Sequence, residues 1–215
     1  MKKFTFIVFF CFGVLLSFAG PLNYGNVLVV ETFDSAAQAT SKWWVFDNLK
    51  RDFVSAKDKN SRSYLKLSGT AADYYVGGMG TYLGKDATPY NALVIDVLGS
   101  GEDSGRLRIQ LYDDDNNTYQ MEMDGNNNPL YDDLFEYDLL VDWEGWRTVE
   151  IPFNDFVLVN PGVGDGRWNP GTLNGSGGLL QIQFLAIANS QYGSLNIGVR
   201  NLLLAEIDKL KAKKK

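Results

Sequence analysis

The stretch RLRIQLYDDDNNTYQMEMD at residues 106–124 contains the clearest structural pattern in the chain. Its first seven residues alternate, so that Leu107, Ile109 and Leu111 share one face of an extended chain and polar side chains share the other. Residues 118–124 alternate in the same way, and the polar residues 113–117 between the two segments are good turn formers. This arrangement predicts a β-hairpin with one buried face.

Short apolar or alternating segments recur along the rest of the chain, separated by Gly, Asn and Asp. One helical segment is expected at 35–42, and the Gly-, Asn- and Pro-rich residues 161–178 predict a long surface loop. With no repeat and no linker, the pattern predicts a single all-β domain of the sandwich type. The further predicted strands are residues 27–31, 43–46, 64–68, 74–76, 81–83, 92–98, 135–141, 146–151, 180–187 and 195–204.

Composition excludes several kinds of chemistry. The 215 residues include no His, which rules out Ser-His-Asp and Cys-His nucleophile pairs, a His general base and His-ligated metals. The formal net charge is −6, but residues 20–205 alone carry 13 Lys and Arg against 24 Asp and Glu, a net of −11. So acidic a body disfavours nucleic acids and anionic lipid as partners and suits neutral glycans, cations or basic protein surfaces.

The two ends of the chain differ from the body. Residues 1–19 combine a basic start, an apolar run and small residues before Gly20, which predicts a signal peptide and export to the periplasm or outside the cell. An uncleaved N-terminal anchor is the alternative. The single cysteine, Cys11, lies in this segment, so the mature domain at 20–205 is expected to have no thiol and no membrane span. Residues 206–215 are expected to form a basic C-terminal tail.

The order of segments resembles the family 11 carbohydrate-binding modules and CIA30-like domains of the galactose-binding-like superfamily. The most specific piece is WRTVEIPFNDF at 146–156. The resemblance implies a two-sheet antiparallel jelly-roll β-sandwich without catalytic activity, a glycan bound on a concave sheet face, and often a structural Ca²⁺ near the chain ends. The other matching pieces are VVETFDS at 29–35, YLKLSG at 64–69, YNALVIDVLGSG at 90–101, LRIQLYDDDNNTYQMEM at 107–123 and LNIGVRNLLLAE at 195–206.

Glycans are recognised by aromatic rings and by planar polar side chains, so outward-facing strand residues of these types are candidate ligands. The polar candidates are Asp96, Arg108, Gln110, Tyr112, Gln120, Glu122, Gln181 and Gln183. One member of each pair Trp43-Trp44 and Tyr74-Tyr75 must face away from the core. The aromatic candidates are Trp43, Tyr75 and Trp168. The alternatives are an ordinary solvated sheet face and rings covered by loops.

Two partners are therefore considered for an exported, non-catalytic module. The first is a poly- or oligosaccharide. The second is a protein of a cell envelope or appendage, because the superfamily also includes assembly factors, protein-binding modules and outer-layer proteins of spirochaetal flagella. A glycosidase would need two carboxylates facing each other across a cleft, and no spacing among the acidic residues singles out such a pair.

Calcium is the one expected cofactor. Glu31, Asp34 and Glu206 belong to the first and last predicted strands, which lie side by side in this architecture, and they are the candidate ligands. The segment 113–117 has a D-x-D-x-N spacing like the start of an EF-hand loop. Because it lacks the later Gly and Glu of that loop, it is interpreted as a solvated turn.

Overall fold

The computed structural model describes residues 24–58 and 61–208. The predicted signal peptide, Cys11 and the lysines of the tail lie outside the described residues. No helix in the two described ranges is long and apolar enough to cross a membrane.

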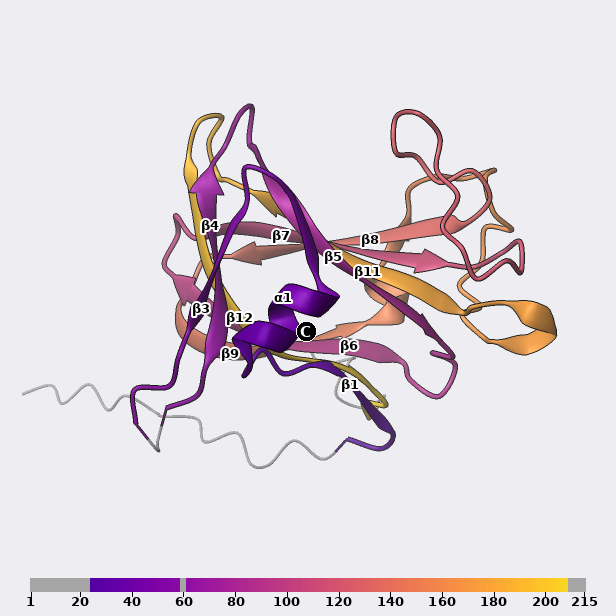
Figure 1. The fold of residues 1–215 in the computed structure, drawn as a ribbon, viewed down its shortest axis with the longest axis horizontal. Helices are drawn as coiled ribbons and strands as arrows, with labels where there is room; N and C mark the ends of the chain where they lie inside the picture. The colour runs from indigo at the N-terminus through magenta and orange to yellow at the C-terminus, as the bar shows by residue number, and fades with distance from the viewer. Residues whose placement is uncertain (1–23, 59–60, 209–215) are drawn as a thin grey trace, which may run out of the picture.

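Two antiparallel sheets pack face to face, and the predicted jelly-roll β-sandwich is confirmed (Figure 1). Sheet A has the order β3-β4-β12-β6-β9, with β1 also paired to β12, and sheet B has the order β10-β8-β7-β11-β5-β2. The strands are β1 (Val27–Glu31), β2 (Trp44–Asp47), β3 (Lys50–Val54), β4 (Tyr64–Thr70), β5 (Tyr75–Lys85), β6 (Ala92–Ser100), β7 (Gly105–Asp113), β8 (Asp133–Val141), β9 (Glu144–Pro152), β10 (Val157–Leu158), β11 (Leu179–Ile187) and β12 (Ser194–Ala205). The helices are α1 (Ala36–Lys42) and the 3₁₀ turns η1 (Phe153–Asp155) and η2 (Leu173–Gly175).

Alternating strands place one apolar face of each sheet in the core. The predicted inward residues of β7, Leu107, Ile109 and Leu111, are all fully buried. The core between the sheets buries apolar side chains from nearly every strand, and this burial is the main stabilising term in a fold that has no disulfide in the described region. The other face of sheet B is therefore left for polar groups.

The predicted hairpin is wrong in its second strand. Strand β7 pairs with β8, with Asp113 opposite Asp133, and residues 114–132 form a long loop. The buried carboxylate of Asp114 accepts hydrogen bonds from the backbone N–H groups of Asn117 and Tyr119, which holds this segment in a turn. The alternating apolar side chains Met121 and Met123 do not face the core; they pack on the outer side of sheet B.

Strand β5 also differs from prediction. The strands expected at 74–76 and 81–83 are parts of one continuous strand that runs through Gly77, Gly78 and Gly80. These glycines allow close approach of a neighbour instead of making a turn. The rings of Phe46 and Trp44 occupy the space where side chains of Gly78 and Gly80 would stand, and backbone atoms of residues 46–49 occupy it at Gly77. Strand β3 was not predicted, since its charged residues hide the alternation.

Candidate ligand-binding groove

The outer face of sheet B carries a polar row that crosses three strands. Gln110 of β7 lies opposite Gln183 of β11, and Gln183 lies opposite Gly80 of β5. In the next row, Tyr112 lies opposite Gln181. Neighbouring strands are about 4.8 Å apart, so these side chains are in direct reach of one another.

The glutamine amides form a continuous hydrogen-bonded chain. Gln181 Nε2 donates to Gln183 Oε1 at 3.1 Å, and Gln183 Nε2 donates to Gln110 Oε1 at 2.6 Å. Gln110 Nε2 then donates to Glu136 Oε1 at 2.6 Å, while the Tyr112 hydroxyl donates to Gln110 Oε1 at 3.2 Å. Because each amide is held by its neighbour, the donors and acceptors of the row are fixed in orientation; Gln110 and Gln181 are buried and Gln183 is partly exposed.

Two aromatic rings flank the glutamine row on the edge strand β2. The outward residues of β2 are Trp44 and Phe46, which pair with Gly80 and Gly78 respectively. A Cβ atom added to Gly80 would lie 2.6 Å from Cζ2 of Trp44, so the indole lies directly over the glycine backbone. The glycines thus let both rings lie over the sheet beside Gln183.

These side chains line a groove of about 380 Å³, a size typical of small-molecule sites. One wall comes from the loop 114–132, which contributes Met123 and Asn127. The full lining is Trp44, Phe46, Asp47, Tyr112, Met123, Asn127, Gln181 and Gln183, and this set is called the glutamine groove below.

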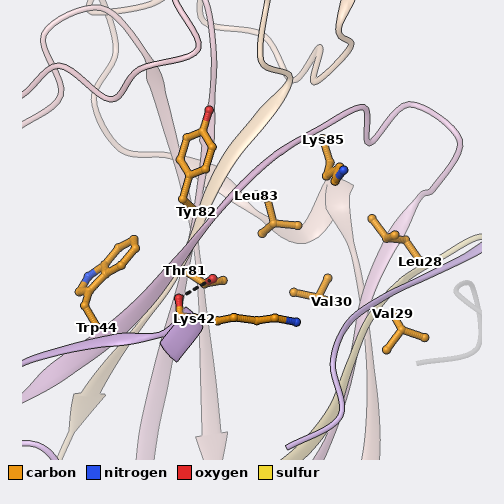
Figure 2. A pocket seen from close by; sticks show the side chains of 9 residues that line it. All are labelled: Leu28, Val29, Val30, Lys42, Trp44, Thr81, Tyr82, Leu83 and Lys85. Atoms are coloured by element: carbon orange, nitrogen blue, oxygen red, sulfur yellow. Dashed lines mark hydrogen bonds between the residues drawn. The ribbon is translucent and has the colours of Figure 1, made fainter. Parts of the chain in front are cut away.

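A second hollow lies on the other side of Trp44. Figure 2 shows Trp44 and Tyr82 on one side and the β1 residues Leu28 and Val30 on the other, with the Lys42 side chain extending between them. Its volume is about 410 Å³. The hollow is mainly apolar, and its charged groups are two lysines, so it has no counterpart to the row of planar amides in the glutamine groove.

Solved structures of carbohydrate-binding modules have a fold similar to that of this chain. The chain is similar to the family 11 carbohydrate-binding module of the cellulosomal cellulase Lic26A-Cel5E of Clostridium thermocellum, with 18% identity, 85% of this chain and 96% of that chain covered, and a TM-score of 0.57. It is also similar to a family 11 module from Clostridium thermocellum in complex with a β-1,3-1,4-mixed-linked tetrasaccharide, with 20% identity, coverage of 84% and 96%, and a TM-score of 0.58. The chain has the β-sandwich fold of family 11 carbohydrate-binding modules. No protein-family model matches the chain, and no curated protein sequence matches it.

Part of the predicted ligand set comes together in this carbohydrate-binding-module fold. Tyr112, Gln181 and Gln183 line the glutamine groove, and Gln110 lies beneath them. Arg108 is one row further along the same face. Its guanidinium forms a bidentate pair with Asp138, in which Nε donates to Oδ1 at 2.7 Å and Nη2 donates to Oδ2 at 3.1 Å. The polar candidates of β7 and β11 therefore share one sheet face, as expected from their alternation.

Three other polar candidates do not join them. Asp96 is on β6 of sheet A, where it accepts hydrogen bonds from Thr148, Arg200 and Asn201. Gln120 and Glu122 are in the loop 114–132, because the strand predicted there does not form. Both Glu122 carboxylate oxygens are used within that loop, by Asn116 and Thr118.

The aromatic candidates Trp43, Tyr75 and Trp168 also lie elsewhere. Trp43 is 2% exposed and stacks on Phe184 in the core, whereas its neighbour Trp44 is 41% exposed and lines the groove. The Tyr75 hydroxyl donates to Asp47 Oδ2 at 2.8 Å, so Tyr75 contacts a groove residue without lining the groove itself. Trp168 packs edge-on against Phe135, closing one end of the core.

Sequence reasoning missed Trp44, Phe46, Asp47 and the two loop residues of the groove. For the rings a signal did exist. In an alternating strand that begins at residue 43, either Trp43 and Val45 or Trp44 and Phe46 face outward, and glycines at every second position of a partner strand favour the larger rings on that face.

The expected calcium ligands at the chain ends do not converge. Glu31 is opposite Leu202, whereas Glu206 is at the other end of β1 and binds Asn26 through Oε2. Leu202 and Glu206 are four positions apart in the extended chain, about 13 Å. Glu31 Oε1 accepts the N–H groups of Thr32 and Phe33, and its Oε2 is 3.9 Å from the Lys42 ammonium. This donor set does not fit a single metal ion.

Aspartates gather instead at the end of sheet B where β7 stops and β8 begins. Asp113, Asp132 and Asp133 are each buried, and each has one buried carboxylate oxygen with no hydrogen-bond donor among the described residues. Burial, reinforced by the carboxylates of Asp115, Asp133 and Asp165, raises the pKa of Asp113 to about 8. Burial and the neighbouring carboxylates therefore oppose ionisation of Asp113, and the segment 113–117 is not a simple solvated turn.

Proposed function

We propose that this protein is an exported, non-catalytic carbohydrate-binding module whose ligand is an oligo- or polysaccharide held in the glutamine groove. The observation that carries the proposal is the row of hydrogen-bonded glutamine amides lying beside two aromatic rings in one groove. The Clostridium thermocellum module in complex with a β-1,3-1,4-mixed-linked tetrasaccharide has a similar fold, which supports a glycan as the ligand class.

The groove offers the two kinds of contact that sugars need. Sugar hydroxyls both donate and accept hydrogen bonds, and a planar amide can serve two neighbouring hydroxyls. In the described part of the chain, no hydrogen bond reaches Oε1 of Gln181, so this oxygen is available to a ligand. The apolar face of a pyranose ring can stack on Trp44 or Phe46.

The arrangement of acidic groups supports a binding role without catalysis. Glycoside hydrolysis requires two carboxylates facing each other across the bond to be cleaved. Asp47 is the one carboxylate in the groove lining, and it already accepts the Tyr75 hydroxyl. Glu136, behind the row, accepts from Gln110 and is 3.5 Å from the Arg108 guanidinium.

A titration experiment tests the proposal. Purified protein is titrated by calorimetry with a panel that begins with β-1,3-1,4-mixed-linked glucan and includes other plant and bacterial polysaccharides. Trp44→Ala and Gln183→Ala should each weaken binding of the best ligand, by about tenfold, because each removes one ring or one pair of hydrogen bonds. Tyr192→Ala is the matched control, since Tyr192 is 73% exposed and lies outside the groove.

Two results contradict the proposal. One is the absence of binding heat across the whole panel with protein shown to be folded by circular dichroism. The other is glycan binding that is lost equally in Tyr192→Ala and in Trp44→Ala, which would place the site outside the glutamine groove.

A further inference from the structure

Three aspartates from three separate segments lie close together at the base of the loop 114–132, where it leaves β7 and enters β8. Asp115 follows β7, Asp133 is the first residue of β8, and Asp165 belongs to the loop between β10 and η2. One carboxylate oxygen from each lies within 4.8 Å of the other two. The two long loops extend together from this end of the sandwich, at the right in Figure 1.

An unsatisfied buried atom points to a missing positive partner. Asp133 is 0% exposed, and its Oδ2 accepts the backbone N–H groups of Gly166 and Arg167. Its Oδ1 is also buried but has no hydrogen-bond donor in the described part of the chain. A Cβ atom added to Gly164 would clash with both Asp133 Oδ1 and Asp115 Oδ2, so these two oxygens face the same small space.

The charges around this space are not balanced by the protein. Within residues 24–58 and 61–208, no ion pair includes Asp115, Asp133 or Asp165. Buried carboxylates that face each other without a cation are strongly unfavourable, because the cost of removing charge from water is not repaid. Asp113 adds a second buried carboxylate beside Asp133, also with a donor-free oxygen.

We propose that Asp115, Asp133 and Asp165 bind one Ca²⁺. The ligand atoms are all oxygens, the hard donors that calcium prefers, and the loops that carry Asp115 and Asp165 can supply backbone carbonyls or water as further ligands. Calcium accepts six to eight oxygen ligands in flexible geometry, whereas magnesium demands near-ideal octahedral geometry, so a site built from two loops and the start of a strand favours calcium.

The bound ion would join the base of one groove wall to a second loop. Asp115 and Asp133 stand at the two ends of the loop that carries Met123 and Asn127 into the glutamine groove. Asp165 comes from the loop 159–178. Calcium bound here would hold the two ends of the loop 114–132 together and connect them to the loop 159–178, whether or not a sugar is bound.

Calcium titration of the full protein tests the site. After treatment with EDTA and its removal, the protein is titrated with CaCl₂ by calorimetry, and its melting temperature is measured with and without 5 mM CaCl₂. We expect one Ca²⁺ per chain and a higher melting temperature. Asp165→Asn should weaken calcium affinity at least about tenfold, because it removes one anionic ligand from an exposed loop position.

Asp103→Asn is the matched control, since Asp103 is exposed and lies in the β6–β7 turn, at the far end of β7 from the aspartates. It makes the same change of charge and should leave calcium affinity unchanged. If Asp165→Asn does not fold, Asp115→Asn takes its place. The proposal is overturned by a melting temperature that calcium does not change, by stabilisation with MgCl₂ but not CaCl₂, or by equal calcium affinity in the Asp165 and Asp103 variants. Glycan binding is measured separately, so failure of the calcium site and failure of the glutamine groove give different results.

Discussion

Substituting Gly80 tests whether the glycines of β5 place the Trp44 ring. A Cβ atom at this position would lie 2.6 Å from Cζ2 and 2.8 Å from Cε2 of Trp44, and no backbone atom is among its three nearest neighbours. Carbon atoms in contact normally stand about 3.5–4.0 Å apart. In Gly80→Ala the indole must therefore move away from the sheet by about 1 Å. The ring can do so because Trp44 is 41% exposed on an edge strand.

We expect Gly80→Ala to weaken glycan binding more than it lowers the free energy of unfolding. If stacking on a sugar buries about 60 Å² of apolar surface, then at about 25 cal/mol per Å² the Trp44 ring contributes about 1.5 kcal/mol, about tenfold in Kd. Gly80→Ala should lose most of this contribution. The free energy of unfolding should change by less than about 1 kcal/mol, because alanine also reduces the freedom of the unfolded chain.

The assay is a double-mutant cycle in glycan affinity, measured by calorimetry with the best ligand of the panel. Gly80→Ala should weaken binding in the wild-type background and have almost no effect in Trp44→Ala, because the ring through which it acts is gone. Gly125→Ala is the control, since a Cβ at Gly125 meets nothing within 4 Å. Wild-type affinity in Gly80→Ala, or an equal loss in both backgrounds, would refute the reasoning.

Three further outcomes are expected. Trp43→Ala should lower the free energy of unfolding by about 3–5 kcal/mol in urea titrations, because it removes a buried ring that stacks on Phe184; a loss below 1 kcal/mol would contradict its core position. Trp168→Ala should cost about 2 kcal/mol of stability, less than a fully buried ring, through contacts with Phe135 and Phe153, and should leave glycan affinity unchanged; weaker glycan binding would contradict its assignment to the core. Hydrogen bonds from Arg108 hold the pKa of Asp138 below its usual range, so the stability that they contribute is present above about pH 4 and is lost as the pH falls further. Asp138→Asn should therefore unfold with a weaker dependence on pH below 4, and an unchanged acid-unfolding profile would exclude this role.

The fold was predictable because its signals are local and repeated. Alternation identified β7 and β11 correctly, and it also placed Gln110, Tyr112, Gln181 and Gln183 on one face. Alternation failed at 118–124, since a Met-bearing loop lying over the outside of a sheet has the same pattern as a strand. The pattern cannot tell which side of the sheet buries the apolar residues, because that depends on partners far away in the chain.

The residues of the site were harder to predict, because their placement also depends on partners far away in the chain. Trp43 and Trp44 are adjacent and chemically identical, and only the pairing of β2 with the glycines of β5 decides which ring faces outward. The three converging aspartates are contributed by the loop that follows β7, the first position of β8 and a distant loop. Their proximity follows from the register of β7 with β8, which the incorrect hairpin obscured.

The last strand has a consequence for how the chain reaches its folded state. Strand β12 pairs with β6 on one side and with β4 and β1 on the other, so residues 27–31 find their partner only at residues 202–205. During synthesis from the N-terminus, sheet A cannot be completed before Ala205 has been made, and such long-range closure is slow. A chain whose sheet closes this late stays incompletely folded until nearly all of it has been made, which is compatible with the export proposed above.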